Sequence, residues 1–160
     1  MIIRETYLQK LRGLRDQKLI KVVTGIRRSG KSTLLEAFKQ KIPNLTFIPG
    51  AINEYRDGWE TSRLVDTMIL KEQAVNADVI VLCLGELPGT EKPGDIRALD
   101  LPEAQLQLAR CAIGTGKPVV ILLIEGRPRT LHGVVEGAAA VLQLYLPGDY
   151  GATACLKILY

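Results

Sequence analysis

The stretch DVIVLCLG at residues 78–85 most constrains the fold, because it is apolar throughout. A strand with one face in water alternates apolar and polar residues, whereas a strand covered on both faces forms a continuous apolar run. Covered strands of this kind belong to parallel sheets with helices packed on both faces. The chain has 160 residues, enough for one domain with a sizeable core.

Four further segments have strand character, and helical patterns separate them. This alternation predicts a five-stranded parallel sheet with helices on both faces, in a single domain over residues 1–160. Ligands are expected at the carboxyl ends of the strands. The strand order is left open between 2-1-3-4-5 and the orders of P-loop NTPases. The predicted strands cover residues 19–26, 45–50, 78–85, 118–126 and 140–148. The predicted helices cover residues 4–17, 32–42, 58–76, 101–116, 131–139 and 150–160.

Composition narrows the class of protein. Hydrophobic residues make up 47% and charged residues 24%, as in soluble globular proteins, and no apolar run approaches the roughly 20 residues that span a membrane. The charged start lacks the apolar stretch of a signal peptide, so a cytoplasmic protein without a membrane partner is expected. The three cysteines have no metal-ligand spacing and are expected to be buried, and no ligand cluster accompanies His132.

Charge is unevenly distributed along the chain. Residues 1–44 contain 11 Lys and Arg against 3 Asp and Glu, whereas residues 45–160 contain 10 against 14. No aromatic residues are interleaved with the basic ones, so nucleic acid is not the expected partner and a solvated basic helix is the favoured interpretation. The change near residue 44 suggests two different origins.

A phosphate-binding motif lies in the basic part. GIRRSGKS at residues 25–32 matches G-x-x-x-x-G-K-[ST] between a predicted strand and a predicted helix. Its N–H groups would bind phosphate oxygens, Lys31 would reach terminal phosphates, and Ser32 would bind Mg²⁺. ATP or ADP with Mg²⁺, or free phosphate or sulfate, is therefore the expected ligand; the alternative is an ordinary glycine-rich turn. The predicted binding residues are Gly25, Arg27, Arg28, Ser29, Gly30, Lys31, Ser32 and Thr33.

Hydrolysis would need a second acidic group to orient the metal. The nearest candidate is Glu86, directly after the third predicted strand. It would face the phosphate loop as a weak Mg²⁺ ligand if the third strand lies beside the first. The favoured alternative is a solvent-exposed loop carboxylate, so little or no ATPase activity is expected.

Two family resemblances follow from these motifs. Residues 4–42, YLQKLRGLRDQ followed by KLIKVVTGIRRSGKST, resemble the opening of a family of prokaryotic AAA-type ATPases, which implies nucleotide binding. From residue 45 onward the pieces TEKPGD, TGKPVV, GRP and LPGDYG resemble the C-terminal α/β sandwich domain of glycoside hydrolase family 3 β-glucosidases.

The second resemblance implies a catalytic residue. In that family the glutamate of the TEKPGD-like loop is often the general acid/base, which corresponds to Glu91 here. The nucleophilic aspartate and most of the sugar pocket belong to a preceding barrel domain, so Glu91 is a weak catalytic candidate on its own.

Together the two resemblances suggest a fusion of two families joined near residues 41–45, with an engineered chimera favoured and natural recombination as the alternative. The expected fold is then a three-layer α/β sandwich of flavodoxin-like or Rossmann-like order 2-1-3-4-5. Its expected function is nucleotide or phosphate binding with little catalysis; a fold without activity and a weak ATPase remain the alternatives. The oligomeric state is left open.

Overall fold

The computed structural model describes residues 19–23 by their backbone, and residues 40, 42, 44–87, 89, 94–148 and 150–159. Within these residues a five-stranded sheet has the order β2-β1-β5-β6-β7, and all neighbouring strands are parallel. When only the five strands of this sheet are numbered in chain order, the order becomes 2-1-3-4-5, as predicted. The strands are β1 (Leu19–Val23), β2 (Thr46–Pro49), β5 (Val79–Gly85), β6 (Val119–Ile124) and β7 (Ala140–Gln143).

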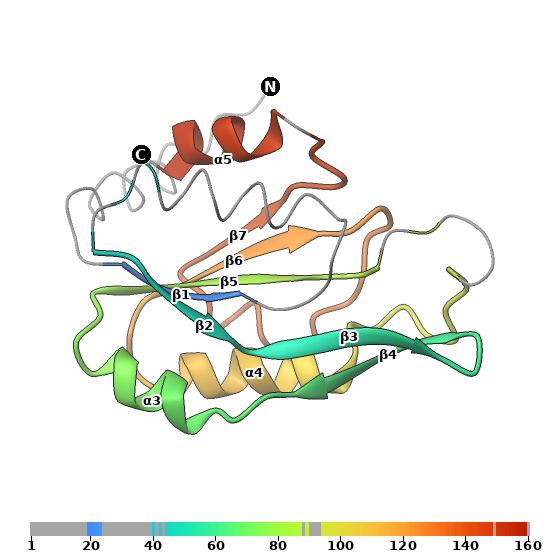
Figure 1. The fold of residues 1–160 in the computed structure, drawn as a ribbon, viewed down its shortest axis with the longest axis horizontal. Helices are drawn as coiled ribbons and strands as arrows, with labels where there is room; N and C mark the ends of the chain where they lie inside the picture. The colour runs from blue at the N-terminus through green and yellow to red at the C-terminus, as the bar shows by residue number, and fades with distance from the viewer. Residues whose placement is uncertain are drawn as a thin grey trace.

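Helices cover both faces of this sheet. Helices α3 (Met68–Ala74) and α4 (Glu103–Ile113) lie on one face, and α5 (Gly151–Leu159) lies on the other (Figure 1). The α/β class is therefore confirmed, as are the predicted helices over 101–116 and 150–160. The predicted helix over 4–17 lies outside the described residues, and only residues 40 and 42 of the one over 32–42 are described.

The continuous apolar runs have the physical cause expected for them. Alternate residues of β5 face opposite sides: Ile80, Leu82 and Leu84 pack towards α3 and α4, whereas Val79, Val81 and Cys83 pack towards α5. Strand β6 divides its residues in the same way. Both strands are buried on both faces, so neither can carry polar residues before its carboxyl end.

The predicted helix over 58–76 is wrong in its first half. Residues 51–64 form an antiparallel hairpin of β3 (Ala51–Arg56) and β4 (Trp59–Leu64), and the helix begins only at Met68. The turn residues Asp57 and Gly58 have φ values of 53° and 79°. Positive φ at both positions of a two-residue turn is the signature of an Asp-Gly hairpin, which outweighed the helical spacing of the apolar residues.

Two other expectations are corrected. The predicted helix over 131–139 is a series of turns, because His132 and Gly133 adopt positive φ values of 35° and 71°. Strand β7 ends at Gln143 rather than near residue 148, and Tyr145 soon after it has a φ of 56°.

The cysteine expectation is confirmed in part: Cys83 and Cys155 are buried and Cys111 is half-buried. In the part of the chain described by the structure, no helix has the length and apolar character needed to cross a membrane.

Candidate functional site

Two glutamates follow the central strands at the carboxyl edge of the sheet. Gly85 of β5 pairs with Ile124 of β6, so Glu86 and Glu125 are the first residues after these two strands. Gly85 has a φ of 147°, and a Cβ there would lie 2.0 Å from the Ile124 carbonyl oxygen. Only glycine permits this close approach, which brings the two glutamates to adjacent positions.

The Glu86 carboxylate is buried and saturated with donors. Its Oε1 accepts hydrogen bonds from the backbone N–H groups of Gly126 (2.8 Å) and Arg127 (3.2 Å). Its Oε2 accepts from Arg127 Nε at 2.8 Å and from Arg129 Nη2 at 2.8 Å. The Glu86 side chain is 3% exposed. An exposed loop carboxylate, the favoured expectation for Glu86, is therefore wrong, because two arginines neutralise it in the interior.

These contacts decide the ionisation of Glu86. Burial alone would raise the pKa of Glu86, since it removes the carboxylate from water. The hydrogen bonds from Arg129 and the Gly126 N–H, together with the charges of Arg129 and Arg127, outweigh burial and lower the pKa of Glu86 below its ordinary value. Glu86 is thus an anion at neutral pH.

The neighbouring Glu125 has the opposite character. It is fully buried, its Oε1 accepts a 3.3 Å hydrogen bond from the Arg129 N–H, and its Oε2 has no hydrogen-bond partner among the described residues. Burial raises the pKa of Glu125 to about 7; the charge of Glu86 adds to this, while Arg129 and the nearby Gln143 amide oppose it. Glu125 therefore exchanges its proton near neutral pH.

Arg129 connects three segments at this edge. Besides Glu86, its Nη2 donates to Glu60 of β4, and its Nη1 donates to the Asp100 carbonyl oxygen at 3.2 Å. Glu60 also accepts a 2.8 Å hydrogen bond from the Leu87 N–H. The side chains of Arg129 and Glu60 are 3% and 4% exposed. The hairpin is thus fixed to both ends of the loop over residues 86–100 by a buried charge network.

Arg127 binds the middle of the same loop. Its Nη2 donates to the Gly94 carbonyl oxygen at 2.6 Å and approaches the Gly89 carbonyl oxygen at 3.5 Å. Tyr55 of β3 stands beside Gly89, because a Cβ on Gly89 would lie 3.0 Å from the Tyr55 hydroxyl. Burial raises the pKa of Tyr55, and the charges of Glu60 and Glu86 raise it further. The Tyr55 hydroxyl therefore remains protonated at this loop.

A buried amide network holds the strand end in place. Gln105 of α4 accepts a 2.8 Å hydrogen bond from the Gly85 N–H and donates to the Gly85 carbonyl oxygen at 2.7 Å. Asn53 of β3 donates to the same carbonyl at 2.9 Å and accepts from Gln105 at 3.0 Å. Helix, hairpin and central strand thus meet at the residue before Glu86.

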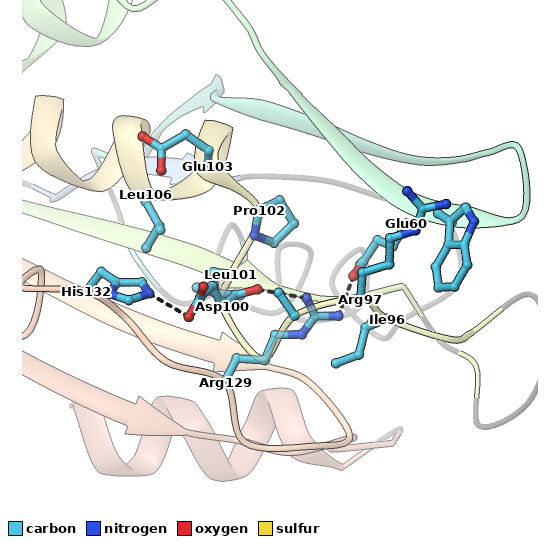
Figure 2. A pocket seen from close by; sticks show the side chains of 12 residues that line it. Glu60, Ile96, Arg97, Asp100, Leu101, Pro102, Glu103, Leu106, Arg129 and His132 are labelled. Carbon is cyan, nitrogen blue, oxygen red and sulfur yellow. Dashed lines mark hydrogen bonds and ion pairs between the residues drawn. The ribbon is translucent and has the colours of Figure 1, made fainter.

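A cavity of about 340 Å³ lies beside this network. Figure 2 shows its charged groups directed mainly at one another: His132 donates to the Asp100 carboxylate, and Arg129 reaches Glu60. Hydrogen bonds from Thr130 and His132 lower the pKa of Asp100. Arg97 lies 4.1 Å from the centre of the Trp59 ring. The cavity therefore offers few unengaged polar groups to a ligand.

The predicted site residues fall mostly outside the described part of the chain. Residues 25–33 and Glu91 are not described, so their predicted contacts with phosphate, Mg²⁺ or sugar stay predictions. Glu86 is described, and β5 does lie beside β1 as its predicted role required. The partners of its carboxylate are the two arginines. Among the described residues, no group of three or more His, Cys, Asp or Glu side chains is arranged to hold a metal ion.

Sequence reasoning missed Glu60, Glu125, Arg127 and Arg129. A signal was present in IEGRPR at residues 124–129, where charged residues directly follow a buried strand. Such residues stand at the carboxyl edge of a parallel sheet, where ligands of α/β proteins bind.

A comparison with protein families finds that residues 12–160 match the model described as the glycosyl hydrolase family 3 C-terminal domain. The lysosomal β-glucosidase of Dictyostelium discoideum is 45% identical over 89 residues, which are 55% of this chain and 11% of that protein. An uncharacterised protein of Haemophilus influenzae is 54% identical over 39 residues, 24% of this chain and 10% of that protein, and its name assigns no activity.

The fold has solved counterparts. A crystal structure of the β-glucosidase from Listeria innocua in complex with glucose matches with a TM-score of 0.72 and 25% sequence identity, over 90% of this chain and 21% of that one. The chain thus spans about a tenth of the curated relatives described above and about a fifth of the solved one.

These matches correct the functional expectation. One family model runs from residue 12 to residue 160, across the predicted junction at 41–45, so a split into ATPase-like and hydrolase-like parts is not supported. The assignment as a chimeric nucleotide-binding domain is wrong. The phosphate-loop motif is a short local pattern, and the alternative of an ordinary glycine-rich turn also accommodates it. The resemblance of residues 45–160 to the glycoside hydrolase domain is confirmed.

Proposed function

Because the chain belongs to the glycosyl hydrolase family 3 C-terminal domain family, we propose that it acts as the accessory catalytic domain of a β-glycoside hydrolase. Its contribution is the loop over residues 86–100, which carries Glu91. The observation that supports this role is the buried charge network at the base of the loop, where Glu86 binds Arg127 and Arg129.

In this proposal Glu91 transfers protons. A retaining glycosidase needs one carboxylic acid to protonate the leaving oxygen and a carboxylate about 5 Å away to form the glycosyl intermediate. Glu91 is the acid, and afterwards the base that activates water. The carboxylate nucleophile comes from a separate barrel domain, as the family resemblance implies.

A general acid must stand within about 3 Å of the atom that it protonates. The loop base meets the structural requirement for such placement, because Arg127, Arg129 and Glu60 fix residues on both sides of the segment 90–93. The names of the relatives described above favour terminal β-linked glucose as the substrate class.

The test uses the full product of the gene that encodes these 160 residues. Its substrate is 2,4-dinitrophenyl β-D-glucopyranoside, whose leaving group needs no protonation, and 4-nitrophenyl β-D-glucopyranoside is assayed beside it. We expect both to be hydrolysed. Glu91→Ala should slow both, because the glycosyl intermediate then lacks the base that activates water.

Azide provides the decisive control. Azide attacks the glycosyl intermediate without deprotonation, so it should restore turnover of the dinitrophenyl substrate by Glu91→Ala and yield β-glucosyl azide. Glu103→Ala, at an exposed helix position, should behave as the unaltered protein does. No hydrolysis by the unaltered protein, or full activity of Glu91→Ala without azide, would contradict the proposal.

A further inference from the structure

The segment that carries Glu91 starts and ends at one place. Gly89 and Gly94 flank residues 90–93, and a Cβ on Gly89 would lie 3.1 Å from the Gly94 Cα. The two backbones are therefore in contact. We call Gly89 and Gly94 the neck of the loop.

One guanidinium joins this neck to the sheet. Arg127 Nε donates to Glu86 at 2.8 Å, while its Nη2 donates to the Gly94 carbonyl at 2.6 Å and faces the Gly89 carbonyl at 3.5 Å. The Arg127 side chain is 33% exposed, whereas its anchor Glu86 is 3% exposed. The exposed end of Arg127 thus holds the loop, and its other end is fixed in the interior.

Arginine suits this task because its donors form a rigid, planar fork. A lysine in the same place would present a single charged nitrogen on a flexible stem. It can pair with Glu86, but it cannot at the same time donate to the neck carbonyls in a fixed geometry. Replacing Arg127 with lysine therefore keeps the positive charge beside Glu86 but removes the planar set of donors that reaches the neck carbonyls.

We propose that Arg127 is a positioning residue for the loop that carries Glu91, because it holds the neck residues Gly89 and Gly94 beside Glu86. This inference rests on the proposed function. In this proposal the pairing of Arg127 with Glu86 stabilises the domain, and its contact with the neck positions the loop for proton transfer.

The first experiment tests the neck without any activity. In the 160-residue chain, ¹⁵N relaxation of the Gly89 and Gly94 amides is measured for the unaltered protein, Arg127→Lys and the control Arg110→Lys, whose site is an exposed ion pair. We expect lower order parameters at both glycines in Arg127→Lys only, with a melting temperature within about 4 °C of the unaltered protein. Unchanged order parameters at both glycines would overturn the proposal.

The second experiment uses the full gene product and the dinitrophenyl substrate. Misplacing a catalytic group by about 1 Å costs on the order of 100-fold in rate. We expect Arg127→Lys to lower kcat by about 10- to 100-fold, with KM changed less than about threefold, and azide to restore part of the rate. A merely structural defect would lower the rate without rescue by azide, and that result would overturn the proposal.

The two experiments separate the two ideas. A mobile neck in Arg127→Lys with undiminished hydrolysis, together with full activity of Glu91→Ala, contradicts the proposed function. If Glu91→Ala loses hydrolysis and azide restores it, while Arg127→Lys keeps full hydrolysis, the role of Arg127 is overturned and the proposed function stands. Arg127→Ala, which also loses the ion pair with Glu86, should be less stable than Arg127→Lys and show the same mobile neck.

Discussion

Glu86 and Glu125 stand one residue past a register pair of neighbouring strands, yet their surroundings give them opposite chemistry. Glu86 receives two backbone N–H groups and two guanidinium groups, and its pKa is lowered despite burial. Glu125 receives one backbone N–H, and burial raises its pKa to about 7.

The difference shows how a sheet edge becomes asymmetric. Arg127 and Arg129 follow β6, but their side chains turn to the carboxylate that follows β5. Glu86 is thereby an anion at neutral pH that binds the loop and, through Arg129, the hairpin, while Glu125 exchanges its proton near neutral pH. The following variants test this contrast, beginning with the largest expected effect.

Glu86→Ala should destabilise the domain most. It removes the carboxylate shared by Arg127 and Arg129 and leaves the buried Arg129 with Glu60 as its only carboxylate partner among the described residues. Breaking a buried ion pair by removing one partner costs about 3–5 kcal/mol. Urea unfolding at pH 7 measures it, and Glu86→Gln, which keeps an acceptor for the Gly126 N–H, should lose less. A decrease in the free energy of unfolding of less than about 1 kcal/mol would show that the charge network around Glu86 does not hold the domain together.

Glu125→Gln should stabilise the domain at alkaline pH. A carboxyl whose pKa is raised on folding contributes stability that is present below its unfolded pKa and lost as pH rises through its folded pKa of about 7. Since one unit of pKa shift is worth about 1.36 kcal/mol, the variant should gain on the order of 3 kcal/mol relative to the unaltered protein between pH 4.5 and pH 8. Unfolding across this range measures it, and a constant difference would contradict the account of Glu125.

Gln105→Leu tests whether the amide network fixes the strand end before Glu86. It leaves the buried Gly85 N–H and Asn53 side chain without their Gln105 partner, at a cost of about 1–3 kcal/mol. The matched control is Gln107→Leu at an exposed position of the same helix. Thermal unfolding of both variants measures the difference, and equal melting temperatures would show that the amide network does not stabilise the domain.

Glu103→Ala should have the smallest effect. Its ion pair with Arg110 is formed at 2.8 Å, the same distance as the contacts to Glu86, but both side chains are about half exposed. Exposed pairs are worth at most about 1 kcal/mol, and this one should cost about 0.5 kcal/mol on urea unfolding. A cost equal to that of Glu86→Ala would mean that burial does not set the difference.

The sheet could be predicted because its signals are local to each strand. The apolar runs of β5 and β6 need cover on both faces, and that requirement alone indicates a parallel α/β sheet. The hairpin was missed, although Asp57-Gly58 is a strong turn signal, because the apolar spacing after it also suits a helix.

The sequence could predict that the site lies at the carboxyl edge of the sheet, but it could not predict the partners of its charged residues. Glu86 is a candidate from the sequence because it follows a central strand, but its burial depends on arginines 41 and 43 residues away and on a hairpin whose second strand was predicted as a helix. The phosphate-loop motif misled for the opposite reason: it is complete within eight residues and carries no information about the rest of the domain.

The most direct test of the contrast is a ¹³C-NMR titration of the glutamate side-chain carboxyls in the 160-residue chain, with Glu125→Gln to assign one resonance. We expect Glu86 to remain ionised to a pH below the ordinary glutamate value of 4.5 and Glu125 to titrate at about 7. If both carboxyls titrated near 4.5, the two strand ends would be equivalent, and Glu86 would not be the buried anchor of the loop.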